Sequence, residues 1–145
     1  MAYLGALEAG GTKMVCAVGR EDGSIVEQVS IPTTEPSRCM PQILEYFRGK
    51  DIDALGVGCF GLLDLDRDSQ SYGSITTTPK LRWRNYPIMR VLGTELGVPV
   101  GIDTDVNAAA LGEAAWGCTQ GLACSMYITV AVSYTHLTLP TIRLV

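Results

Sequence analysis

Runs of apolar residues, separated by turn residues, divide the chain into short predicted elements. Near the N-terminus, three β-rich runs are joined by tight turns, which predicts a meander of three antiparallel strands over residues 3–7, 14–18 and 25–31. Further along, predicted helices alternate with predicted strands. This order indicates an α/β domain with a mixed sheet flanked by helices.

The later elements are marked by their end residues as well as by their apolar periodicity. Pro87 stands at the start of one predicted helix, a position that proline favours, and Gly97 and Gly117 follow the ends of two helices. The predicted helices cover residues 41–48, 87–96 and 106–116, and the predicted strands cover residues 55–59, 98–102 and 125–130. Residues 71–78 are polar and β-rich.

Composition restricts the class of protein. With 145 residues, of which 47% are hydrophobic and 18% charged, the chain is globular and long enough for a core. The net charge is −4 and no cluster of lysine and arginine stands out, which disfavours a nucleic-acid or anionic-membrane partner. No apolar run approaches the roughly 20 residues of a membrane span, and no secretion signal is recognisable. We therefore expect a cytoplasmic protein.

The five cysteines are odd in number and match no zinc-ligand spacing. Cys16 and Cys59 lie in strand-like apolar runs, where cysteine behaves as a small hydrophobic residue. We predict reduced structural thiols and no metal site formed by them.

The turn between the first two strands carries Glu8, Gly10, Gly11, Thr12 and Lys13. Glycine lets backbone N–H groups approach a ligand, and a hydroxyl and an ammonium group beside them suit a phosphate. Glu8 could hold a magnesium ion directly or through water. A plain hairpin, in which the glycines serve only the turn, is the alternative. A P-loop is excluded, because Gly11 stands where lysine is required and a strand follows instead of a helix.

A second polar cluster follows the predicted strand 98–102, where a helix begins. Asp103 or Thr104 can cap that helix, and Asp105 falls in its first turn, where the helix dipole favours a carboxylate. Capping explains only one of the two aspartates. Since ligands of open α/β sheets bind beyond the carboxyl ends of strands, Asp105 is also a candidate general base. Asn107 could hold that carboxylate or a substrate hydroxyl.

Five motifs together resemble the ROK sugar kinases of the actin-like ATPase superfamily, and within them the bacterial fructokinase branch. They are EAGGTK at residues 8–13, GCFG at 58–61, SITTTPK at 74–80, WRNYP at 83–87 and DVNAAALGE at 105–113. The resemblance covers residues 3–130 and implies an actin-like ATPase (ribonuclease-H-like) N-terminal domain. Many members carry aspartate in place of Glu8, and glutamate favours the fructokinase branch.

The resemblance also implies an activity, namely transfer of the γ-phosphoryl group of ATP to a sugar hydroxyl with Mg²⁺. It makes Asp105 the general base, and it makes Glu8 and Gly10, Gly11, Thr12 and Lys13 the cofactor-binding residues. The substrate-binding residues that it implies are Gly61, Pro79, Trp83, Asn107 and Glu113. Fructose is the first candidate substrate. Glucose, mannose, N-acetylmannosamine or a non-catalytic regulatory role are alternatives, and Trp83 could equally be a core residue.

The C-terminal residues do not continue the α/β pattern. The ten residues VSYTHLTLPT, at 132–141, resemble a translated transposon-based sequencing adapter. We therefore divide the chain into a kinase N-terminal domain, 1–130, and a non-native tail, 131–145, which sets aside His136 as a functional residue. We expect the natural protein to continue into a second phosphate loop, a structural zinc site and an adenine-binding domain, to form a homodimer, and this chain alone to be inactive.

Overall fold

The computed structural model describes residues 2–130, so the predicted tail with His136 lies outside the described residues. The strands are β1 (Tyr3–Ala9), β2 (Lys13–Arg20), β3 (Ile25–Pro32), β4 (Ala54–Cys59) and β5 (Val100–Thr104). The helices are α1 (Pro36–Arg48), α2 (Ile88–Leu96) and α3 (Asp105–Trp116), with a short 3₁₀ helix, η1, at Leu81–Trp83.

The five strands form one mixed sheet in the order β3-β2-β1-β4-β5. Strands β1, β2 and β3 form the predicted antiparallel meander, and β4 and β5 extend it parallel to β1. Ala9 pairs with Cys59, and Cys59 pairs with Thr104. The carboxyl ends of the three parallel strands are therefore level with one another.

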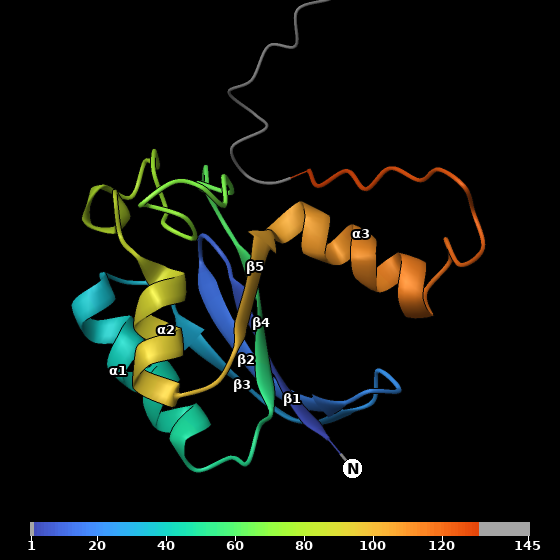
Figure 1. Ribbon diagram of the computed structural model, residues 1–145, viewed down its shortest axis with the longest axis horizontal. Helices are drawn as coiled ribbons and strands as arrows, with labels where there is room; N and C mark the ends of the chain where they lie inside the picture. The colour runs from blue at the N-terminus through green and yellow to red at the C-terminus, as the bar shows by residue number, and fades with distance from the viewer. Residues whose placement is uncertain (1, 131–145) are drawn as a thin grey trace, which may run out of the picture.

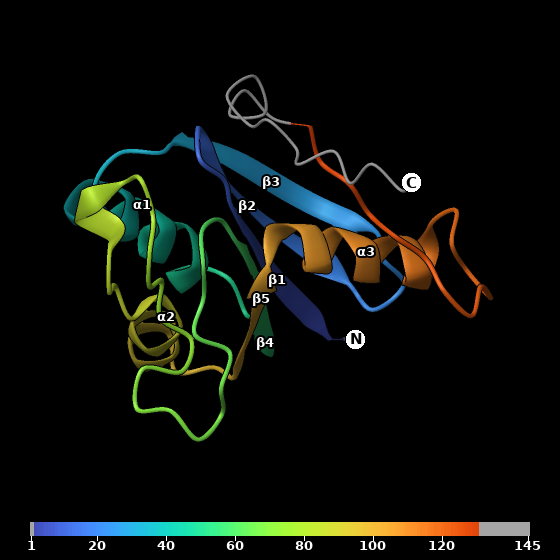
Figure 2. The same cartoon turned by 90° about the horizontal axis from the view of Figure 1, so that it is seen from above.

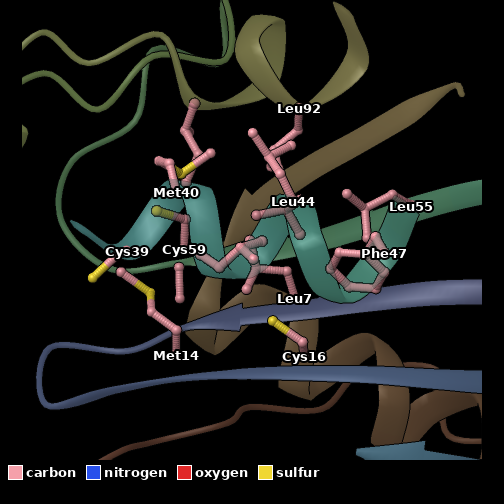
Figure 3. Close-up of a cluster of buried hydrophobic side chains, with 14 of the residues drawn as sticks. Leu7, Met14, Cys16, Cys39, Met40, Leu44, Phe47, Leu55, Cys59 and Leu92 are labelled. Atoms are coloured by element: carbon pink, nitrogen blue, oxygen red, sulfur yellow. The ribbon is translucent and has the colours of Figure 1, made fainter. Parts of the chain in front are cut away.

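Helices cover both faces of the sheet, α1 and α2 on one face and α3 on the other (Figures 1 and 2). The layer under α1 and α2 is the main core, and Figure 3 shows side chains from both sides of it. The labelled strand residues are Leu7, Met14, Cys16, Leu55 and Cys59, and the labelled helix residues are Cys39, Met40, Leu44, Phe47 and Leu92. Full burial of each leucine or phenylalanine contributes about 1.5–3 kcal/mol, so this layer supplies most of the hydrophobic stabilisation.

The opposite layer is thinner and depends on small residues. No residue of α3 is fully buried. A Cβ atom on Gly58 of β4 would lie 2.9 Å from the Cβ atom of Ala108, so glycine at this position lets α3 rest directly on the sheet. At its far end, Trp116 packs on Gly23 of the β2–β3 turn, whose φ is +84°.

Three predicted elements differ from the structure. They are the helix at 41–48, the strand at 98–102, which is found at Val100–Thr104, and the strand at 125–130. Helix α1 begins at Pro36, not at residue 41, because Pro36 takes the first-turn position and Pro41 lies inside the helix. Residues 71–78, which are β-rich in composition, form no strand, and among them only Ile75 makes isolated bridges, to Leu63 and Tyr86. Residues 125–130 also form no strand. Their sequence is β-rich, but within residues 2–130 no strand pairs with them, and an isolated strand is not stable in water.

The described cysteines agree with the prediction of structural thiols. Cys16, Cys39 and Cys59 are buried, and all five are free. Burial raises the pKa of Cys16 and of Cys59 to about 12, so these thiols stay protonated at neutral pH. None of the helices within residues 2–130 has the length and apolarity of a membrane span.

Candidate active site

Three segments meet at the carboxyl edge of the parallel strands: the β1–β2 turn, the loop after β4 and the first turn of α3. Figure 1 shows all three at the upper end of the sheet. The backbone N–H of Phe60 donates to the carbonyl of Ala9 at 2.9 Å, which fixes the loop after β4 to the end of β1. The two polar clusters of the sequence are thus brought to one edge, as their positions after strands predict.

The two glycines of the β1–β2 turn have different reasons to be glycine. The N–H of Gly10 donates to the carbonyl of Lys13 at 3.0 Å, and a Cβ atom on Gly10 would lie 2.6 Å from that carbonyl oxygen. The turn itself therefore excludes a side chain at Gly10. A Cβ atom on Gly11 would meet no atom within 4 Å, and its φ is not in the left-handed region. The fold of the described residues gives no reason for glycine at position 11.

This turn has two of its carbonyl groups paired with a neighbouring residue and two of its N–H groups facing solvent. The carbonyl of Gly10 accepts a hydrogen bond from Thr33 Oγ1 at 2.7 Å, and the carbonyl of Thr12 accepts one from the Thr33 N–H at 2.9 Å. Within residues 2–130, the N–H groups of Gly11 and Thr12 donate to no acceptor. Exposed N–H groups beside the exposed Lys13 form an environment suited to an anion.

Thr33 itself was not singled out in the sequence. The available signal was its place directly after β3, which is antiparallel to β2 and ends level with the turn: Pro32 pairs with Lys13. A hydroxyl at such a strand end is within reach of the neighbouring turn.

Glu8 lies on the α3 side of the sheet and is exposed, between the buried residues Leu7 and Ala9. It pairs with Gly58, which pairs in turn with Asp103, so the two carboxylates flank a glycine on one face. Two strand spacings of about 4.8 Å separate them. Within residues 2–130, no three His, Cys, Asp or Glu side chains gather as a metal site. Glu8 therefore fits only a magnesium ion whose other ligands are water and phosphate oxygens, the usual pattern for Mg²⁺.

Asp105 is the first residue of α3 and is half-buried at the end of β5. Thr104 is the cap, because its Oγ1 accepts from the Asn107 N–H at 3.2 Å. Asp105 Oδ1 accepts from the Val106 N–H at 3.0 Å, and within the described residues Oδ2 accepts no hydrogen bond. Asp105 lies close to the end of β4, because a Cβ atom on Gly58 would be 3.5 Å from its Cα atom. After burial, the negative charge of Asp105 is the second cause of the raised pKa of Cys59.

The side chain of Asn107 binds the carboxylate of Asp103 and not that of Asp105. Its Nδ2 donates to Asp103 Oδ1 at 2.9 Å, and the same oxygen accepts from the Thr104 N–H at 2.7 Å. The side chain of Asn107 thus fixes Asp103, and Asp105 is left with one free oxygen at the edge of the sheet.

Comparison with known proteins supports the assignment that these residues suggest. The profile described as "ROK family" matches residues 4–132. The chain belongs to the ROK family. A "Putative fructokinase" of Bacillus subtilis (strain 168) is 50% identical over 127 residues, which are 88% of this chain and 42% of that protein. A fructokinase of Pediococcus pentosaceus is 42% identical over 127 residues, 88% of this chain and 44% of that protein.

A solved ROK structure shows the same architecture. The ROK family glucokinase from Streptomyces griseus, in complex with glucose and AMPPNP, superposes with a TM-score of 0.66 at 27% identity, covering 83% of this chain and 38% of that one. The fold is therefore that of the actin-like ATPases, as expected. This chain spans less than half the length of these ROK proteins.

The remaining residues implied by the ROK resemblance are not all gathered near Asp105. Glu113 lies eight residues further along α3, about 12 Å away at the helical rise. Its Oε2 accepts from the Cys118 N–H at 2.9 Å, and this hydrogen bond lowers the pKa of Glu113. Glu113 thus closes the C-terminal end of α3 in the described structure. Gly61, with φ +83°, and Pro79 are both exposed, on the loops that follow β4.

Trp83 is a core residue and not a surface for stacking a sugar ring. Its side chain is 1% exposed. Indole Nε1 donates to the carbonyl of Thr34 at 2.6 Å, and the ring packs edge-to-face on Phe60 and Tyr86. The indole faces that a sugar ring would stack on are covered, so Trp83 supports its loop from within the core.

Proposed function

We propose that the full-length protein containing these residues transfers the γ-phosphoryl group of ATP to a hydroxyl of a hexose, with fructose as the first candidate. The observation that carries the proposal is the juxtaposition at one sheet edge of a turn with outward N–H groups and a carboxylate with a free oxygen. Similarity to fructokinases and the glutamate at position 8 support fructose over other hexoses.

The β1–β2 turn serves the phosphate groups of ATP. The N–H groups of Gly11 and Thr12 and the ammonium group of Lys13 bind phosphate oxygens and compensate their negative charge. Mg²⁺, next to Glu8, would neutralise further phosphate charge. Phosphoryl transfer depends mainly on such positioning and charge compensation, because little covalent help is needed.

Asp105 serves the acceptor. Its carboxylate takes the proton of the sugar hydroxyl while the hydroxyl oxygen bonds to the γ-phosphorus, and the bond from that phosphorus to the bridging oxygen of ADP breaks. The hydrogen bond from Val106 N–H orients Oδ1, which leaves Oδ2 for the proton. Asn107 and Asp103 stabilise the strand end from which this carboxylate projects.

The wider setting follows from the same proposal. A kinase that uses ATP and has free buried thiols suits the reducing cytoplasm. The resemblance implies a homodimer and a structural zinc site. Since residues 2–130 contain no metal-binding cluster, such a zinc ion would be held by residues beyond them.

The test is turnover by the full-length protein with ATP and a panel of fructose, glucose, mannose and N-acetylmannosamine, followed as ADP release. We expect fructose to give the highest kcat/KM. Asp105→Ala should lower kcat by about 10²- to 10⁴-fold with little change in ATP affinity. Asp68→Ala, which removes an exposed carboxylate of the loop after β4, is the matched control and should leave kcat unchanged.

Two outcomes would contradict this proposal. Near-normal turnover of Asp105→Ala would remove Asp105 from its role. Sugar binding by the wild-type protein without any ADP release would favour the regulatory alternative.

A further inference from the structure

Thr33 contacts the β1–β2 turn through its two hydrogen-bond donors. Its hydroxyl donates to the carbonyl of Gly10 at 2.7 Å, and its backbone N–H donates to the carbonyl of Thr12 at 2.9 Å. Among the described residues, no other side chain donates a hydrogen bond to this turn. Thr33 is half-buried, so its hydroxyl bond is partly protected from competing water.

The geometry of the peptide bond gives these contacts a consequence. The carbonyl of Gly10 and the N–H of Gly11 belong to one planar unit and point in opposite directions. When Thr33 holds the carbonyl oxygen of Gly10 on its own side, the N–H of Gly11 must face the other side, toward solvent. In the same way, the bond to the carbonyl of Thr12 fixes the peptide unit that carries the N–H of Lys13. Of the two outward donors, Thr33 therefore sets the direction of the Gly11 N–H, and it fixes the chain on both sides of the Gly11–Thr12 peptide that carries the other.

The next residue connects this contact to a distant loop. The carbonyl of Thr34 accepts the Trp83 Nε1–H at 2.6 Å, and Trp83 packs on Phe60 with ring centroids 5.8 Å apart. Phe60 in turn donates its N–H to the carbonyl of Ala9, one residue before the turn. The loop around η1 is thus linked to the turn by two separate routes, through Thr34 and through Phe60.

We propose that Thr33 is a positioning residue that orients the Gly11 N–H donor of the β1–β2 turn, and that Thr33 and Thr34 together couple this turn to the Trp83 loop. The inference rests on the proposed kinase function. According to this proposal, the turn and the Trp83 loop, on either side of the candidate site, keep a fixed position relative to each other. A substitution at Trp83, which does not touch the turn, should then change the affinity for ATP.

The first test separates binding from turnover in the full-length protein. Thr33→Val keeps the shape and the backbone N–H and removes only the hydroxyl. We expect the KM for ATP to rise about tenfold, as for loss of one hydrogen bond, while kcat changes less than about threefold. Thr33→Ser keeps the hydroxyl and should restore a KM near the wild-type value. A purely structural role would lower stability in Thr33→Val without this split between KM and kcat.

The control variant removes another hydroxyl that donates to a backbone carbonyl, far from the turn. Tyr46 Oη donates to the carbonyl of Glu27 at 3.3 Å, between α1 and β3 on the opposite face of the sheet from α3. Tyr46→Phe should leave the KM for ATP unchanged. An equal rise in Tyr46→Phe would mean that the effect is unspecific and would overturn the inference.

The second test addresses the coupling and remains decisive if Thr33→Val does not fold. Trp83→Phe keeps an aromatic ring in the core and removes the bond to Thr34. We expect a severalfold rise in the KM for ATP as well as for the sugar. An unchanged KM for ATP would overturn the coupling.

The failures of the two proposals are distinguishable. An active wild-type enzyme with a normal KM for ATP in Thr33→Val contradicts the role of Thr33 and leaves the kinase function standing. A wild-type protein that releases no ADP with any hexose contradicts both.

Discussion

The β1–β2 turn at residues 10–13, for which phosphate binding is proposed and which is called the phosphate turn below, and the acidic loop at residues 64–71 are both polar surface segments. They differ in which of their donors and acceptors are already hydrogen-bonded. In the acidic loop, Asp64 Oδ2 accepts from the hydroxyls of Ser69 and Ser71 at 2.6 and 2.5 Å. Asp64 Oδ1 accepts from the Asp66 N–H at 3.1 Å, and Asp66 Oδ1 accepts from the Asp68 N–H at 3.0 Å. The loop satisfies these donors with its own carboxylates.

In the phosphate turn, Thr33 satisfies the carbonyls of Gly10 and Thr12, and the N–H groups of Gly11 and Thr12 are left outward. Residue type alone therefore does not distinguish a binding segment from a structural one. What separates them is which backbone groups are already paired. A segment whose N–H donors are paired internally has none left for a ligand. A segment whose carbonyl acceptors are paired by a neighbour can keep N–H donors free to bind an anion.

The largest expected effect tests the structural side of the phosphate turn. Gly10→Ala places a Cβ atom against the carbonyl oxygen of Lys13, which the backbone must move to relieve. We expect the free energy of unfolding to fall by about 1–3 kcal/mol, as for other overpacked sites. Chemical denaturation of the full-length protein measures it. A stability equal to wild type would show that the turn is looser than described.

Gly11→Ala is the counterpart in the same turn. Since its new Cβ atom meets no protein atom and its φ is ordinary, we expect stability within about 0.5 kcal/mol of wild type. The KM for ATP should nevertheless rise about tenfold, because the methyl group blocks close approach of phosphate to the N–H groups. Steady-state kinetics at varied ATP decide this. If stability falls and the KM for ATP does not change, glycine at position 11 serves the fold and not the binding of phosphate.

A smaller effect is expected in the acidic loop. Asp64→Asn keeps the size of the side chain and removes the charge that strengthens its bonds to Ser69 and Ser71. The thermal midpoint should fall by less than in Gly10→Ala, and the KM for ATP should not change. A raised KM would place the acidic loop in the binding machinery and remove the contrast between the two segments.

The smallest effect concerns pH. The hydroxyl of Ser69, followed by that of Ser71, lowers the pKa of Asp64 in the folded protein. Stability from this carboxylate is therefore present above its unfolded pKa of about 3.9 and is lost as the pH falls through the lower folded value. Below about pH 4, the stability of wild type should fall more steeply than that of Asp64→Asn. Parallel curves in denaturation at a series of pH values would contradict the assignment.

Local patterns in the sequence predict much of this fold and part of the site. The hairpin turn, the β-rich runs and the Asp105 cluster follow from periodicity and from residue types that directly flank strands. Contacts between distant segments do not follow. The burial of Trp83 depends on Thr34 and Phe60, and the hydroxyl of Thr33 matters only because β3 ends beside the turn.

Two further misjudgements have the same origin. The amide of Asn107 could reach either Asp103 or Asp105 along the first turn of a helix, and only side-chain conformation selects Asp103. The β-rich residues 125–130 form no strand, because strand formation requires a partner and not only propensity.

The contact between Gly58 and α3 has a consequence for how this site can vary. Ala108 rests on Gly58 three residues after Asp105, and a helix transmits a displacement along its length as a nearly rigid rod. A single added methyl group on β4 would therefore lift the whole first turn of α3 and carry the carboxylate with it. The position of the proposed base relative to its acceptor therefore depends on the absence of a side chain at Gly58, on the strand beneath α3.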